Sequence, residues 1–199
     1  MAINNSAFNL QNFKSNLTGG GARPNLFRVD LDFPSAILTA AGSNNAATLQ
    51  RLGYFMVKAA NLPASQVGTI EVPFRGRTLK VAGDRTFEPW TITVINDTNF
   101  ALRNTFETWV NTINQSVRNV GLQNPADYQK DMVVHQLNRE GNAIKAYKFY
   151  GTFPTNVSAI DLAFDTNDTV EEFTVELQVQ WWTPIAATSD NNGGGGNQS

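Results

Sequence analysis

The 199-residue chain contains no cysteine and a single histidine. No apolar run approaches the roughly 20 residues that a membrane-spanning helix needs. Without cysteine the chain cannot form a disulfide, a thiolate nucleophile or a thiolate zinc site. Its first residues, MAINNSAFNLQNFK, have neither the basic start nor the apolar run of a secretory signal. We therefore expect a fold that depends on packing, with no membrane anchor, formed in the cytoplasm where the chain is made.

Basic charge is also scarce. The chain has 15 lysines and arginines against 17 acidic residues, and its pI is about 5.4. Proteins that grip nucleic acid usually show a basic stripe or a domain pI above about 9. We expect any contact with DNA to be non-adhesive.

The length suits one compact domain, which we place at residues 23–184, between two atypical ends. Residues 1–22 form an Asn- and Ser-rich arm that closes with three glycines. Its apolar residues Phe8, Leu10, Phe13 and Leu17 can share one face of a helix, although so short a helix is marginal alone. The arm is either a disordered terminus or a segment that docks on a neighbouring subunit. Residues 185–199 are rich in Gly, Asn and Ser and are expected to be disordered.

Alternation of apolar and polar residues predicts that most of the domain is β-structure. The first two strands are expected at Leu26–Phe33 and Tyr54–Ala59. Hairpins are expected for Ile70–Phe74 with Leu79–Val81, and for Asp131–Asn138 with Ala143–Tyr150. Pro154 should end that pairing, a strand should begin near Val157, Ile160 and Leu162, and a last strand should run from Phe173 to Trp181.

One long helix is predicted, because apolar residues recur at three and four positions. They are Phe106, Trp109, Val110, Ile113, Val117 and Val120, with N-cap candidates at 96–99 and an end at Gly121. Residues 35–51 lack clear periodicity and are expected to form a loop, while Pro125–Tyr128 should make a short helical turn. These elements predict a mainly β protein, an antiparallel β-sandwich or barrel with one packed helix.

The stretch LKVAGDRTFEPWTITVIND, residues 79–97, carries a turn and a strand. Gly83 is expected to take a positive φ in a tight turn beside Asp84, since only glycine does so without steric cost. Pro89 should mark the start of the strand that begins at Trp90. Asp84 and Arg85 either fix the turn or bridge to a neighbouring subunit, and both roles remain open.

This stretch resembles the tail tube proteins of T4-like contractile-tailed bacteriophages. Further motifs match in the same chain order: ARPNLF from Ala22, FMVKAANLP from Phe55 and GTFPTNV from Gly151. Several ordered motifs are far more specific than one short pattern. The resemblance covers roughly 22–184, and its motif residues, expected to serve assembly, are Arg23, Pro24, Asn25, Gly83, Asp84, Arg85, Phe87 and Trp90.

The resemblance implies a structural subunit of the virion, without enzymatic activity or cofactor. Its subunits would form six-membered rings that stack into the inner tail tube, with sheets joining between subunits into a large tube-lining barrel. Implied partners are other copies of the chain, the tail sheath protein, the tape-measure protein, the baseplate hub and the tail terminator. Double-stranded DNA would pass through the tube during genome ejection without specific binding.

The alternation of two strands supplies a candidate face for the lumen that the resemblance implies. If their apolar residues are buried, the opposite side chains form a polar surface: Thr91, Thr93, Thr174, Glu176, Gln178 and Gln180. Some of these residues are expected to line the lumen and give it a neutral-to-acidic surface that repels DNA weakly. The alternative is that the same face is external and meets the sheath.

Other chemistry is poorly supported. His135 lies in a predicted strand and no G-x-S-x-G motif accompanies it, which favours an ordinary sheet histidine. Asp165, Asn167 and Thr169 mimic a calcium loop that lacks its glycine and has its final glutamate within a predicted strand, so a turn is favoured. Trp181 and Trp182 should face opposite ways, one into the core and one toward an interface.

Two rival functions remain. One is the tube of a phage-derived contractile injection or secretion system. The other is a monomeric ligand-binding β module that uses one of the two tryptophans.

Overall fold

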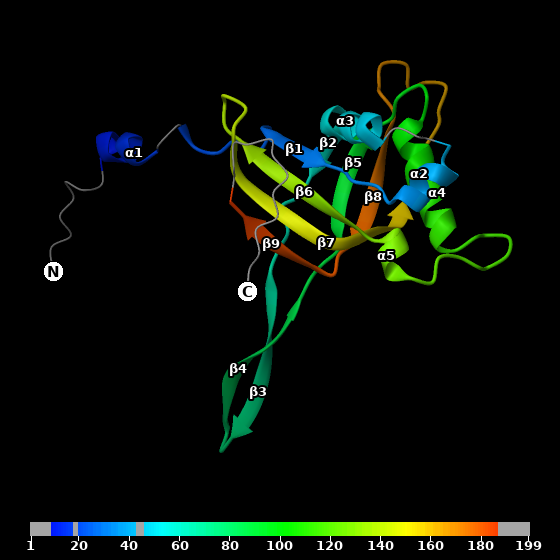
Figure 1. Cartoon of the computed structure of the whole chain (residues 1–199). Helices are drawn as coiled ribbons and strands as arrows, with labels where there is room; N and C mark the ends of the chain where they lie inside the picture. Colours follow the sequence, from blue (N-terminus) through cyan, green and yellow to red (C-terminus); the bar gives the residue numbers. More distant parts are fainter. Residues whose placement is uncertain (1–8, 18–19, 43–45, 187–199) are drawn as a thin grey trace.

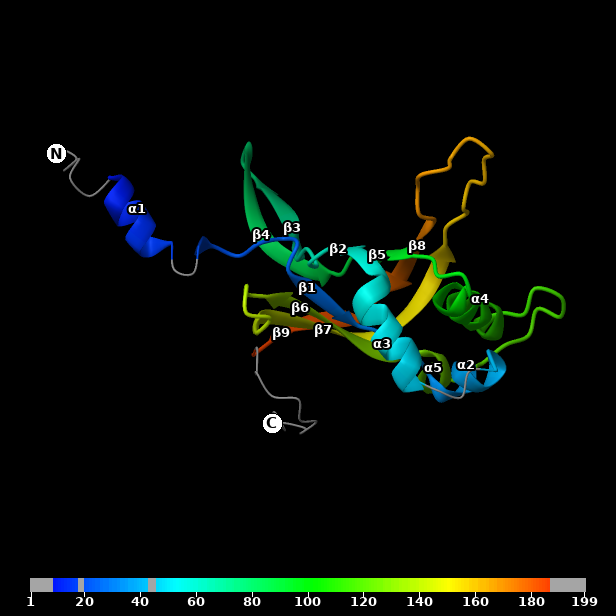
Figure 2. The ribbon, with the colours of Figure 1, turned by 90° about the horizontal axis from the view of Figure 1, so that it is seen from above.

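The computed structural model describes residues 9–17, 20–42 and 46–186 (Figure 1). Its body is a seven-stranded antiparallel sheet in the order β1-β6-β7-β8-β5-β2, with β9 beside β7. The strands of the body are β1 Phe27–Asp30, β2 Val57–Ala60, β5 Trp90–Ile95, β6 Lys130–Leu137, β7 Ala143–Val157, β8 Glu172–Gln178 and β9 Trp181–Ile185. A separate hairpin, β3 Gln66–Phe74 and β4 Arg77–Thr86, projects from this body in both views (Figures 1 and 2). The predicted mainly β, antiparallel fold class is confirmed.

Strand β7 holds the sheet together by changing partners. It pairs with β6 up to Thr152 and with β8 from Phe153 onward, and β9 pairs with its first part. Pro154, which lacks a backbone donor, lies at this change. The pairing with β6 ends just before Pro154, as predicted, although the strand itself continues to Val157 against β8 with a shifted register.

The core lies inside the curled sheet. Alternate residues of β5 and β8 are at most 2% exposed: Trp90, Ile92, Val94, Phe173, Val175 and Leu177. Trp90 stacks on Phe149 of β7, with ring centroids 4.3 Å apart. Its indole nitrogen donates to the carbonyl of Asn61 at 2.9 Å. Burying such side chains contributes about 1.5–3 kcal/mol each, so the β5–β8 pair is central to stability.

Helix α4, Ala101–Ile113, packs on this core through Leu102, Phe106 and Trp109. The Asp97 carboxylate accepts the first helical N–H, that of Ala101, at 3.0 Å. The predicted extension through Val120 is wrong: Val117 and Val120 are 92% and 56% exposed and lie beyond the helix. The chain instead folds back on the C-terminal end of α4. A Cβ on Gly121 would lie 1.9 Å from the carbonyl oxygen of Ile113, so a side chain at this position would clash with the helix.

Residues 35–51 are not the predicted loop. They contain α2, Ser35–Ala40, and the start of α3, Ala46–Met56, so the strand predicted from Tyr54 begins only at Val57. Helix α3 packs on the end of β1, since Leu49 and Gly53 are buried and a Cβ on Gly53 would lie 3.0 Å from Leu31. The glycine on this face permits the close approach. The shorter helices α1, Leu10–Asn16, and α5, Pro125–Tyr128, complete the described elements, and α5 is the predicted helical turn.

Two predictions near the C-terminus are also wrong. Residues 158–171 form a loop rather than a strand, with Leu162 83% exposed. The last strand does not reach Trp181: β8 ends at Gln178, the chain bends at Gln180, and Trp181 begins β9 with 49% exposure. Trp182 packs edge-on against Tyr147, with ring centroids 5.6 Å apart.

Candidate assembly surfaces

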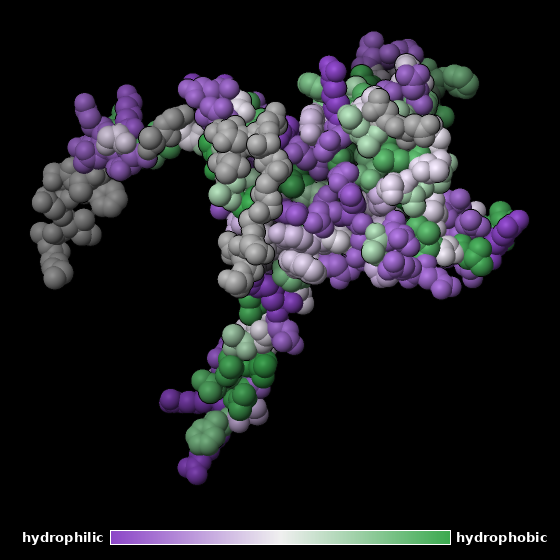
Figure 3. Space-filling view, in the orientation of Figure 1, coloured by the Kyte–Doolittle hydropathy of each residue, from purple (hydrophilic) through white to green (hydrophobic). Residues whose placement is uncertain are grey.

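The projecting hairpin has one apolar face that nothing in the described chain covers. Ile70 pairs with Val81, and Val72 pairs with Leu79, so these side chains share a face with Phe74. All five are 45–68% exposed. Apolar surface gathers on the hairpin in Figure 3. Contiguous exposed apolar surface of this kind marks an interaction site.

The opposite face of the hairpin is polar. It carries an ion pair between Lys80 and Glu71 at 3.6 Å, with Thr69 and Thr78 on either side. The hairpin predicted for Ile70–Phe74 with Leu79–Val81 is present, and Arg75 and Gly76 join its strands with φ of 46° and 81°. A two-stranded hairpin is marginally stable in water by itself, so burial of its apolar face against another surface would stabilise this one.

Gly83 does not form the predicted turn. It lies within β4, where Gly83 and Asp84 form a bulge opposite the single residue Gly68 of β3, and it has no positive φ. A Cβ at Gly83 would lie 3.2 Å from the carbonyl oxygen of Gly68 and 3.2 Å from Ile70. Glycine is needed for close approach of the two strands, rather than for a positive φ. Asp84 and Arg85 are exposed on the same strand, so the turn-fixing role fails and the bridging role stays a prediction.

The remaining motif residues belong to the body. Arg23, Pro24 and Asn25 lie in the turn before β1, and the side chain of Gln136 on β6 donates to the Arg23 carbonyl at 2.6 Å. Phe87 is half-buried against Trp182, and Trp90 is buried in the core. The structure therefore divides the motif between the hairpin and the body.

The candidate lumen residues of β5 and β8 do lie on one face. Thr91 pairs with Glu176, and Thr93 pairs with Thr174, while the intervening residues are buried. We call this surface the polar face: Thr91, Thr93, Glu172, Thr174, Glu176 and Gln178. Gln180 lies outside it, at the bend after β8. The Lys58 ammonium forms an ion pair with Glu172 at its edge.

Strands β1 and β6 carry a second cluster, of charged and aromatic side chains, that sequence patterns do not predict as a unit. Asp30 accepts from Arg28 at 2.9 Å and lies 3.2 Å from His135. The Arg28 guanidinium also lies over the ring of Tyr54 at 5.1 Å. Burial raises the pKa of Tyr54 and nearby Asp30 raises it further, while Arg28 lowers it. The pairing of β1 with β6 assembles this cluster, and no local motif signals it.

Helix α1 presents Leu10, Phe13 and Leu17, which are 70%, 62% and 44% exposed. Asn9 caps the helix by accepting the N–H of Asn12 at 2.7 Å. None of the seven helical residues is buried. Phe8, the fourth predicted contact, lies outside the described residues, as does most of the tail predicted at 185–199.

The family model of phage tail tube proteins matches residues 22–184, most of the chain. The chain belongs to this family. It is 34% identical over 166 residues to the tail tube protein gp19 of Enterobacteria phage T4, covering 83% of this chain and 93% of that protein. It is 33% identical over 160 residues to the tail tube protein of Serratia phage KSP90, covering 80% and 86%.

Solved structures share the fold at lower identity. A chain in the cap of the anti-feeding prophage superposes with a TM-score of 0.60 at 16% identity, covering 84% of this chain and 92% of that one. A chain in the sheath-tube complex of an extracellular contractile injection system gives 0.54 at 14% identity, covering 87% and 97%.

Because the chain belongs to the phage tail tube family, its role is structural and non-enzymatic, and it is a component of the virion tail. The match includes the hairpin and the polar face, whereas α1 precedes it. Among the residues that the structure describes, no helix is long and apolar enough to cross a membrane. The described ranges also hold no group of three side chains suited to a metal ion.

Proposed function

We propose that this tail tube protein forms six-membered rings that stack into the inner tube of a contractile phage tail, the conduit for genome ejection. The observation that carries the proposal is the uncovered apolar face of the hairpin, in a chain that belongs to the tail tube family. Strands β1, β2 and β9 each have one partner in the described sheet. Their free edges can pair with neighbouring subunits and extend the sheet into a tube-lining barrel.

The polar face lines the lumen in this proposal. It carries two carboxylates, and the Lys58 ammonium beside it is already paired with one of them, Glu172. A basic wall would hold each phosphate and make passage strongly salt-dependent. The polar face has no such stripe, which suits DNA in transit. The alternative assigns the polar face to the sheath and another surface to the lumen.

The proposed partners follow the architecture of contractile machines. One structure with this fold comes from a sheath-tube complex, another from a tube-terminating cap and a third from a baseplate. By analogy we assign this chain a tail sheath protein, a tail terminator and a baseplate hub as partners. A tape-measure protein in the lumen belongs to the same proposal. The division of the chain into an arm at 1–22, a tube domain at 23–184 and a tail at 185–199 is also part of the proposal.

Electron microscopy of the purified full chain tests the proposal. We expect rings or tubes without nucleotide or metal, and a reconstruction with Thr93, Thr174 and Gln178 facing the channel. A predominantly basic channel wall, or one without these side chains, would refute the lumen assignment. A strict monomer at high concentration, stabilised by a ligand, would favour the ligand-binding module instead.

The same fold in injection systems favours a second candidate, a tube that carries protein effectors. Neighbouring genes distinguish the two. Capsid and terminase genes would support the phage tail, whereas effector and spike genes without a capsid would support the injection system.

A further inference from the structure

Two projecting features lie far apart on the molecule. One is the hairpin tip, residues 74–80, at the free end of β3 and β4. The other is the acidic loop, defined as residues 158–172: the loop 158–171 between β7 and β8 together with Glu172, the first residue of β8. Both views place them at distant ends of the body (Figures 1 and 2). One copy therefore cannot bring its own hairpin tip to its own acidic loop without unfolding.

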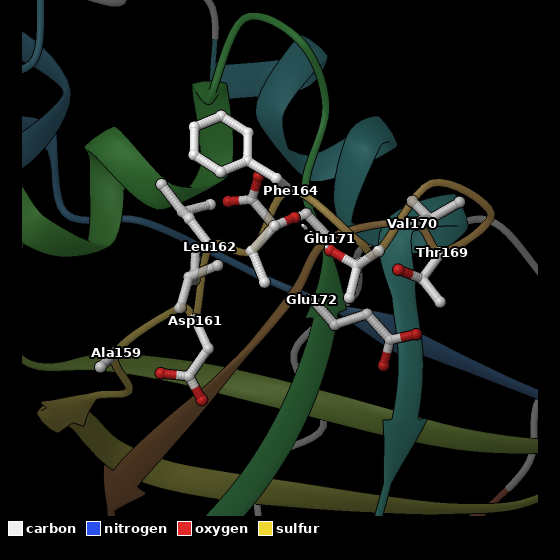
Figure 4. A pocket seen from close by; sticks show the side chains of 11 residues that line it. Ala159, Asp161, Leu162, Phe164, Thr169, Val170, Glu171 and Glu172 are labelled. Carbon is white, nitrogen blue, oxygen red and sulfur yellow. Dashed lines mark hydrogen bonds between the residues drawn. The ribbon is translucent and has the colours of Figure 1, made fainter.

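The acidic loop encloses an open pocket of about 690 Å³. Asp161 and Leu162 lie on one arm of the loop, and Thr169 and Val170 on the other (Figure 4). Apolar side chains here have no cover in the described chain: Leu162 is 83% exposed, Phe164 is fully exposed and Val170 is 66% exposed. This pocket has an apolar wall and an open mouth.

Charge distinguishes the two features. The acidic loop contains five carboxylates and no basic residue, while the hairpin tip contains three basic residues and no acidic one. Lys80 of the tip is paired with Glu71, whereas Arg75 and Arg77 form no ion pair within the described ranges. Glu172 is paired with Lys58, and Glu171 accepts from Asn96 at 2.9 Å. The other three acidic residues, Asp161, Asp165 and Asp168, form no ion pair within the described ranges. The tip adds exposed Phe74 and Leu79, so apolar surface and charge both match between tip and loop.

We propose that the hairpin tip of one copy inserts into the acidic loop of the next copy. This inference rests on the proposed assembly into rings or tubes and names the surfaces that join two subunits. Strand β3 has nine residues, and at about 3.3 Å per residue it reaches roughly 30 Å, enough to cross to a neighbour. The contact is head-to-tail, because the two surfaces differ, and such contacts close into rings or continue as filaments.

Cysteine cross-linking tests the contact directly, because the native chain has no cysteine. The full-length double variant Phe74→Cys with Phe164→Cys is assembled and treated with a short bis-maleimide. We expect a ladder of covalent oligomers, whereas each single variant stops at dimers. The matched control pairs Phe74→Cys with Val117→Cys, a 92% exposed site in a different loop, and should give no ladder.

Charge reversal provides an independent readout. Arg75→Glu with Arg77→Glu should raise the concentration needed for assembly about tenfold, as should Asp161→Lys with Asp165→Lys, because like charges then meet. Combining all four changes should restore assembly. Arg118→Glu, which reverses an exposed basic residue in the loop after α4, is the control and should change little.

The outcomes separate this inference from the proposed function. If the wild-type chain never assembles, the proposed function fails. If it assembles normally but shows no ladder, or if the four-residue swap is no better than either pair, tip insertion is refuted while the tube remains.

Discussion

The β5–β8 pair and the β3–β4 hairpin share the same alternation of apolar and polar residues, but the apolar face is buried in the first and exposed in the second. Both are antiparallel pairs whose apolar residues meet across the strands, Ile92 with Val175 in one and Val72 with Leu79 in the other. The first two side chains are completely buried, whereas Val72 and Leu79 are 45% and 63% exposed. Alternation thus predicts a face that will be covered, without saying whether the same chain or another copy covers it.

The largest expected effect comes from the core that the β5–β8 pair shares with β7. Phe149→Ala removes the ring stacked on Trp90 and should lower the free energy of unfolding by about 3–5 kcal/mol. Denaturant unfolding of the unassembled chain measures this loss. A change below about 1 kcal/mol would contradict the claim that these strands share one core.

On the hairpin, Val72→Ser with Leu79→Ser should abolish assembly while the free energy of unfolding of the body changes by less than about 0.5 kcal/mol. The reason is that both side chains are exposed in the single subunit and buried only by a partner. Light scattering and circular dichroism give the two readouts. Thr69→Ser with Thr78→Ser, on the opposite face of the hairpin, is the matched control, and equal loss of assembly in it would argue against an apolar interface.

Gly83→Val should weaken assembly less completely. A Cβ there already lies 3.2 Å from the Gly68 carbonyl oxygen, so valine must push the hairpin strands apart. Overpacking of this kind costs about 1–3 kcal/mol where the structure cannot relax. The thermal midpoint of the body should stay constant while tube yield falls. Gly83→Ala should show a smaller effect, and a normal yield with valine would show that the close approach is not required.

Deleting residues 1–21 should shorten tubes without unfolding the domain. None of the α1 residues is buried, so its apolar face is available to a neighbouring subunit. Tube lengths in negative-stain images, compared with the full chain, measure the effect. A milder change, Leu10→Ser with Phe13→Ser, should act in the same direction. Equal tube lengths in all three proteins would make the arm a passive terminus.

The smallest expected effect concerns Tyr54. Burial, reinforced by Asp30, raises its pKa, so the folded state favours the neutral phenol. Its contribution to stability is therefore complete below the unfolded-state pKa of about 10 and is lost as the pH rises through the higher folded-state pKa. Tyr54→Phe should flatten the fall in thermal midpoint between about pH 9 and about pH 11. An unchanged pH profile would contradict this role.

Sequence patterns predict an element correctly where a local rule, such as a turn signal or alternation, agrees with the environment of that element in the fold. The hairpin turn at Arg75-Gly76, the 131–150 hairpin and the start of β5 after Pro89 all follow from turn and strand chemistry. The body strands β5 and β8 follow from strict alternation, which by itself also predicts that their polar residues share one face. The ordered motifs from Ala22 to Pro184 predict the family, and the family match over 22–184 confirms it.

Only the tertiary structure decides the features that depend on distant partners. The weak periodicity of α3 predicts a loop followed by a strand, whereas its helix is stabilised by packing on Leu31, a contact between separate elements. Glycine permits both positive φ and close approach, so only the neighbouring strand shows which of them Gly83 provides. The tertiary structure also decides that the apolar face of the hairpin is exposed. Its sequence specifies two paired strands with one apolar face, but the absence of a covering element within the described chain is a property of the whole fold.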